Sequence, residues 1–234
     1  MERNILHPTY GSILAAAKIS GFYSAATKRL EAWSDNSTAT AGDPAPLLSV
    51  IDEAMRLQND LKFWASSLPE SARPRHMTAT DGRLLITHSS RWLGSVWSLY
   101  LSSLILFYSK VLSCCQAMQD TDCGESPEET DRVTAAAVLA KRSIVELVGT
   151  ICGGIPYLFG EVDEDGELRE VSDHKASILY NMVWPLALIR RCRFSTADQI
   201  RMCGESLRYV GKTYGLNLAY SAEAVLAEAL GDVL

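Results

Sequence analysis

The chain has no cysteine pairs at the spacing of metal ligands. Its six cysteines are spread along the sequence: Cys114, Cys115, Cys123, Cys152, Cys192 and Cys203. None of them forms a C-x-x-C pair, the usual sign of a structural zinc site, in which thiolates must gather around one ion. The sequence therefore predicts no metal site, and its cysteines are expected to be reduced thiols, several of them buried.

Positively charged residues are also fewer than negatively charged ones. The chain has 22 lysines and arginines against 28 aspartates and glutamates, which gives a formal net charge of −6. Affinity for nucleic acid comes largely from neutralising phosphates with Lys and Arg. We therefore expect no direct binding to nucleic acid.

Histidines are few, and no arrangement of them specifies catalysis. The four are His7, His76, His88 and His174. The partners of a catalytic triad must meet in space, and no spacing along this sequence identifies them. The sequence assigns no catalytic residue, and no motif in it implies a cofactor.

A secretion signal and a convincing membrane span are both missing. The opening M-E-R-N-I-L-H-P contains no continuous apolar segment, so the protein is expected to be nuclear or cytoplasmic and not secreted. The stretch from Trp92 to Ser109 has no charged side chain and is long enough to cross a bilayer. Its serines and the helical period of its largest side chains favour a buried helix, so no membrane partner is expected.

What the chain does have is the composition of a globular helical protein. Nearly half of its 234 residues are hydrophobic and 21% are charged. Apolar side chains recur at helical spacing, as they do from Val50 to Trp64. We predict an all-α fold, with residues 1–234 forming one domain of about seven to eight helices. The expected loops lie near 34–46, 66–82, 119–128 and 160–173.

Several boundaries can be predicted from local signals. Ser126 is expected to cap a helix whose first turn holds Pro127 and two carboxylates. Gly153-Gly154 and Pro156 are expected to end that helix. The long apolar helix before it should start near Leu84. The expected loop near 160–173 is rich in acidic residues, and this acidic loop can form one small hairpin around Asp165-Gly166.

Five short elements occur in an order that resembles the regulatory region of fungal zinc-cluster transcription factors. They are Leu68-Pro69, Trp97 with Tyr100, the P-Y-L-F-G run at 156–160, the W-P-L run at 184–186, and the segment from Leu207 to Ala219. The resemblance implies a transcription-factor-like regulatory or effector domain that acts through protein partners or a small-molecule inducer. The missing cysteine cluster implies that the chain has no DNA-binding module of its own.

The helix around Trp97 departs from this family in one informative way. Such proteins often carry asparagine and arginine where this chain has Ser98, Leu101 and Leu104. The change extends the core or lines a cavity with apolar surface. A second hypothesis follows, in which the scaffold is a cofactor-free isomerase or cyclase of fungal specialised metabolism. A third is a helical scaffold that acts only by forming a homo-oligomer.

Aromatic side chains are the candidate contacts for a hydrophobic small molecule, because each ring offers apolar area and several carry a polar atom. The same spacing is also usual in core packing. The candidates are His88, Trp92, Trp97, Tyr100, Tyr157, Tyr180 and Trp184.

Overall fold

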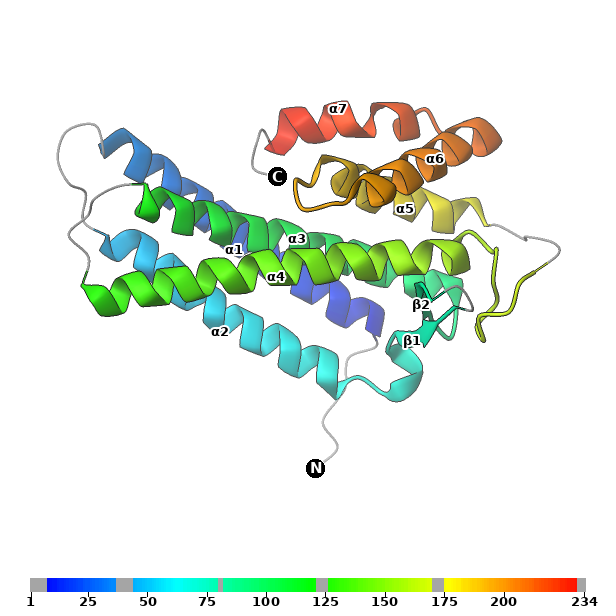
Figure 1. Ribbon diagram of the computed structural model, residues 1–234, viewed down its shortest axis with the longest axis horizontal. Coiled ribbons are helices and arrows are strands. Elements are labelled where there is room, and N and C mark those ends of the chain that lie inside the picture. The colour runs from blue at the N-terminus through cyan, green and yellow to red at the C-terminus, as the bar shows by residue number, and fades with distance from the viewer. Residues whose placement is uncertain (1–7, 37–43, 80–81, 121–125, 170–174, 231–234) are drawn as a thin grey trace.

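The computed structural model describes residues 8–36, 44–79, 82–120, 126–169 and 175–230, and these residues are mostly helical (Figure 1). They form seven α-helices, a one-turn 3-10 helix at Glu70–Ala72 and one two-stranded sheet. The helices are α1 (Pro8–Asn36), α2 (Ala45–Ser67), α3 (Arg91–Gln119), α4 (Pro127–Leu158), α5 (Ala176–Arg191), α6 (Ala197–Tyr214) and α7 (Leu218–Leu230). The all-α prediction is confirmed.

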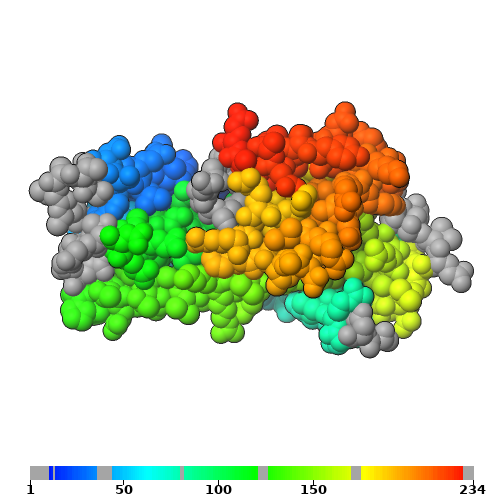
Figure 2. All heavy atoms as spheres, turned by 45° about the horizontal axis from the view of Figure 1, so that its top comes forward, coloured from blue at the N-terminus to red at the C-terminus, as the bar shows by residue number. Residues whose placement is uncertain are grey.

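Helix α3 is the centre of the molecule. It packs against α1, α2, α4 and α5, while α6 and α7 pack on α5 (Figure 1). Figure 2 shows α5 to α7, in yellow to red, gathered in one mass over part of the long helices. On this face they leave α1 and the start of α4 uncovered.

The apolar stretch that could have crossed a membrane is the core of α3. The helix is long and apolar enough to span a membrane, but about two thirds of its most apolar stretch of 18 residues is buried inside the bundle. Ser90 caps its first turn by accepting a hydrogen bond from the backbone N–H of Leu93. The burial agrees with the predicted buried helix.

Helix α4 begins as predicted and ends later than predicted. Ser126 and Glu129 form a reciprocal capping box, with Pro127 in the first turn. The expected stop at Gly153-Gly154 and Pro156 is wrong, because the helix continues to Leu158. Packing against the neighbouring sheet stabilises this last stretch and offsets the weak helix propensity of glycine and proline.

That neighbour is a hairpin that the sequence did not predict. Strand β1 (Arg75–Thr78) pairs antiparallel with β2 (Leu84–Thr87), where a loop and the start of the long helix were expected. Three of the four residues of β2 are buried, and the strand packs on α4. The contact between β2 and α4 joins residues that are far apart in the sequence, so no local sequence signal predicts it. The acidic loop contains one isolated antiparallel bridge, Val162 with Leu168, around a turn in which Gly166 has a φ of 83°.

Candidate functional site

Four of the seven candidate side chains form one aromatic cluster near the hairpin. The ring of His88 lies 6.4 Å from that of Trp97 and 6.4 Å from that of Tyr157, measured between centroids. Trp97 and Tyr100 are 5.4 Å apart in an edge-on arrangement. Trp64 of α2 joins them, at 6.0 Å from Trp97 and 5.1 Å from Tyr100. The sequence placed Trp64 on the apolar face of its helix and did not identify it as a site residue.

The other three candidates lie elsewhere. Trp92, in the first turn of α3, is 49% exposed, and Tyr180 in α5 is 53% exposed. Trp184 is half-buried against the core, next to Pro185 inside α5. Among the described residues, no ring contact links these three to the cluster.

Trp97 is fixed in place by the segment that follows α2. Its indole N–H donates a hydrogen bond of 2.8 Å to the carbonyl oxygen of Ala72. The guanidinium of Arg73 in turn donates to the carbonyl oxygen of Leu68 at 2.8 Å, which holds this segment close to the end of α2. These hydrogen bonds link the tryptophan of α3 to the segment that begins with Leu68-Pro69, another of the elements on which the family resemblance rests.

His88 follows β2 and is buried, with 4% of its surface exposed. The hydroxyl of Tyr157 donates to the backbone carbonyl of His88 at 2.7 Å. Burial, with a smaller contribution from His76, lowers the pKa of His88 to about 4, so its imidazole is neutral at pH 7. Its Nδ1 is buried without a hydrogen-bond partner in the part of the chain that the structure describes.

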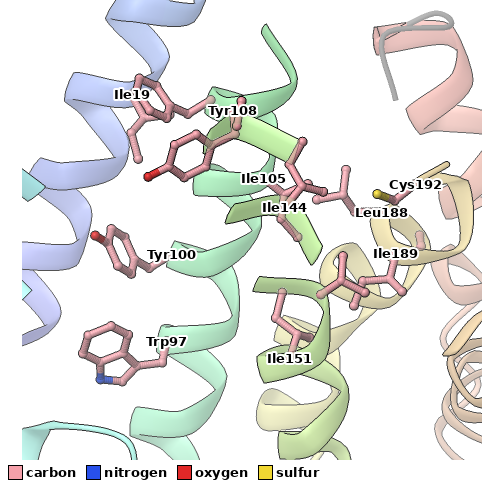
Figure 3. Close-up of a cluster of buried hydrophobic side chains, with 14 of the residues drawn as sticks. Ile19, Trp97, Tyr100, Ile105, Tyr108, Ile144, Ile151, Leu188, Ile189 and Cys192 are labelled. Carbon is pink, nitrogen blue, oxygen red and sulfur yellow. The ribbon is translucent and has the colours of Figure 1, made fainter. Parts of the chain in front are cut away.

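A groove of about 490 Å³ opens next to this cluster, between α2, α3 and α4. Figure 1 shows α2 and α4 diverging toward the hairpin. The base of the groove is formed by aromatic and leucine side chains of α3: Trp97, Tyr100, Leu101, Leu104 and Tyr108. In Figure 3, Trp97, Tyr100 and Tyr108 project from the same side of α3.

The walls and rim of the groove come from α2 and α4. Apolar and small side chains line the walls: Leu61, Ala65, Leu139, Ser143, Leu147 and Thr150. Charged groups occur at the exposed rim, where Lys62 faces an ion pair between Arg142 and Glu146, whose atoms are 2.8 Å apart. The groove is thus apolar inside and polar at its mouth, as small-molecule sites commonly are.

Few polar groups reach the interior of the groove. The hydroxyl of Tyr108 donates to Oε1 of Gln58 at 3.0 Å. Burial raises the pKa of Tyr108 and of Tyr100 above the ordinary value, so both phenols stay protonated. Gln58 could have been found from the sequence, since it lies four residues after Ala54 and three before Leu61, on the apolar face of α2.

The groove is elongated. The α3 residues along its base run from Trp97 to Tyr108, and the α4 residues run from Leu139 to Thr150, eleven residue steps in each case. At the helical rise this length is about 16 Å. The shape suits a long, narrow molecule.

A larger depression of about 980 Å³ lies between the end of α4, the acidic loop and α6. Its lining mixes positive and negative side chains, and Arg201 already pairs with Asp198 at 2.9 Å and with Glu205 at 3.7 Å. These charges are exposed and largely offset one another. The depression gives weaker grounds for a specific site than the groove does.

The described residues contain no group of three or more His, Cys, Asp or Glu side chains that could hold a metal ion. Burial raises the pKa of the Cys114 thiol to about 11 and that of Cys115 to about 12, so both stay protonated. Neither is a reactive nucleophile at neutral pH.

Comparison of the chain with protein-family models, with curated proteins and with solved structures gives no match.

Proposed function

We propose that the protein is a regulatory or effector domain that responds to an elongated, hydrophobic small molecule bound in the groove between α2, α3 and α4. The single observation that carries this proposal is the groove itself, with its aromatic base, apolar walls and charged rim. Its volume of about 490 Å³ is that of a typical small-molecule site.

The groove is suited to binding because its base is already held in shape. The hydrogen bond between Trp97 and Ala72 and the one between Tyr108 and Gln58 fix the two ends of the aromatic row. A preformed site loses less conformational entropy when a ligand enters. A ligand would also bridge α2 and α4, which both pack on α3.

The regulatory part of the proposal is supported by the order of the sequence elements that resemble fungal regulatory regions. The net charge of −6 and the missing cysteine pairs support a role without direct binding to DNA. On this proposal, occupation of the groove stabilises one arrangement of α2 and α4 on α3, and a protein partner in the nucleus or cytoplasm recognises that arrangement.

The enzymatic alternative has less support from the groove. A cofactor-free isomerase or cyclase needs a proton donor or acceptor whose pKa is near the working pH. Burial raises the pKa of both phenols in the groove, and the neighbouring His88, with a pKa of about 4, is a weak base. These residues favour binding over proton transfer.

The proposal can be tested by filling the groove. Leu104 lines its base, so the larger side chain of Leu104→Trp would fill the part of the groove in which a ligand would bind. Val138→Trp is the matched control, because Val138 lies on the exposed face of α4, with 61% of its surface accessible. We expect Leu104→Trp to abolish binding of dodecanoate, measured by displacement of a fluorescent apolar dye, and Val138→Trp to leave it unchanged. Equal binding by both variants would refute the groove as the site.

A further inference from the structure

We infer that the groove continues inward to His88 and that this histidine selects ligands with a hydroxyl group at their buried end. The inference rests on the proposed function, since it concerns the inner end of the same groove. It adds the chemical class of the ligand, a long apolar molecule with a terminal hydroxyl.

The groove has a small cavity as its neighbour. A small cavity of about 10 Å³ lies beside His88, and it shares Trp97, Leu101 and Thr150 with the groove. A volume of this size holds about one water-sized group. The two spaces are therefore neighbours that are separated by few side chains.

Leu101 is the one side chain of the three that no hydrogen bond holds in place. The indole of Trp97 is tied to Ala72, and the hydroxyl of Thr150 donates to the carbonyl oxygen of Glu146 at 2.8 Å. Leu101 is half-buried and has no polar atom to anchor it. A change of its rotamer would join the cavity to the groove.

His88 has a buried nitrogen, Nδ1, that lacks a hydrogen-bond partner among the described residues. A buried polar atom without a partner is unfavourable, and most such atoms in proteins are paired. The rest of the cavity wall offers little to Nδ1. It is mainly apolar, and the hydroxyl of Ser98 already donates to the carbonyl oxygen of Gly94 at 3.0 Å. His88 is one of the residues that line this cavity. On this inference, a ligand group that reached the cavity would supply the missing partner of Nδ1.

A hydroxyl fits this position better than a charged group. It can donate to Nδ1 or accept from it, so it satisfies either tautomer of a neutral imidazole. A carboxylate at the same place would lose its hydration without gaining a positive partner. His88 is held in position, since its ring stacks on Trp97 at an interplanar angle of 28° and its carbonyl accepts from Tyr157.

The test compares two probes that differ only at one end, dodecanoate and ω-hydroxydodecanoate, with binding measured by calorimetry. We expect the unmodified protein to bind the hydroxylated probe about five- to tenfold more tightly, the gain of one hydrogen bond. His88→Phe keeps the ring packing and removes Nδ1, so this preference should disappear or reverse. His76→Phe, at an exposed position of β1, is the matched control and should retain it.

A second variant tests the passage. Leu101→Ala should strengthen binding of the hydroxylated probe more than that of dodecanoate, while Leu104→Ala, further along the groove, should weaken both alike. Circular dichroism and the thermal midpoint establish that each variant is folded.

The outcomes separate this inference from the proposed function. If both probes bind the unmodified protein and His88→Phe with equal affinity, the hydroxyl selection is wrong and the groove remains the site. If neither probe binds, the groove proposal and this inference are both overturned.

Discussion

Helix α3 has an aliphatic side, which faces α4 and α5, and an aromatic side, which faces α2 and the hairpin. Figure 3 shows Ile105, Ile144, Ile151, Leu188 and Ile189 gathered on the first side, while Trp97, Tyr100 and Tyr108 project from the other. The aliphatic residues are almost completely buried and bring no polar side-chain atoms with them.

The aromatic side chains are also buried, though less completely, and this side of α3 has hydrogen bonds and unfilled space. It contains the Trp97 to Ala72 bond, the Tyr108 to Gln58 bond, and the unpaired Nδ1 of His88. The groove and the small cavity both open here. The comparison indicates that the aliphatic side mainly stabilises the bundle, whereas the aromatic side holds the features that a ligand could use.

The largest effect is expected from a truncation on the aliphatic side. Leu188 is fully buried, so Leu188→Ala removes apolar contacts and leaves a cavity. We expect the free energy of unfolding to fall by about 2–5 kcal/mol, measured by urea denaturation. Affinity for dodecanoate should not change. Weakened binding in a variant that is still folded would contradict the assignment of stability to the aliphatic side and of ligand binding to the aromatic side.

Lowering the pH should destabilise the protein, because it protonates His88, which packs on the aromatic side of α3. The pKa of His88 is lowered to about 4, whereas that of the unfolded chain is the ordinary 6.5. The neutral ring therefore contributes stability that is complete above pH 6.5 and is lost as the pH falls toward and below 4. The shift corresponds to roughly 3 kcal/mol.

The measurement is the free energy of unfolding at a series of pH values between 7 and 4. His88→Phe should remove this part of the pH dependence, and His76→Phe should keep most of it, losing only the smaller contribution of His76 to the lowered pKa of His88. An unchanged acid response in His88→Phe would show that other groups titrate there.

Two glycines of α4 sharpen the comparison, because only one of them touches the hairpin. A β-carbon added to Gly153 would lie 3.0 Å from the carbonyl oxygen of Leu84, whereas one added to Gly149 would meet nothing within 4 Å. We expect Gly153→Ala to destabilise the protein by about 1–3 kcal/mol through crowding. Gly149→Ala should stabilise it by about 0.5–1 kcal/mol. Thermal unfolding of the pair checks both signs, and equal shifts would contradict the close approach of β2 to α4.

The smallest effect concerns the start of α4, away from both sides of α3. Ser126→Ala removes the side-chain half of the capping box and should cost about 1 kcal/mol. Ligand binding should stay the same. Ser126→Asp, which can still cap, is the control in the same denaturation experiment.

Local signals in the sequence predicted the helical class and some boundaries. The start of α4 was readable because Ser126, Pro127 and the carboxylates act within one turn. The hairpin and the late end of α4 were both missed, and one contact explains both errors. Strand β2 packs on the last turns of α4, so each stabilises the other across a wide separation in sequence.

The candidate site was predictable by residue type and only partly by position. His88, Trp97, Tyr100 and Tyr157 were selected as aromatic or histidine side chains, and they do come together. The contributions of α2 and α4 depend on how these helices lie across α3, which periodicity does not specify. Trp92 and Tyr180 share the chemistry of the cluster but lie in exposed positions.

The most direct test of the account is a titration of methyl-labelled protein with ω-hydroxydodecanoate, followed by NMR. We expect chemical-shift changes at the methyl groups of Leu101, Leu104 and Leu147, which line the groove, and little change at Leu188 and Ile189. Shifts confined to the aliphatic side, or to α6 and α7, would contradict the central claim that the aromatic side of α3 holds the binding site.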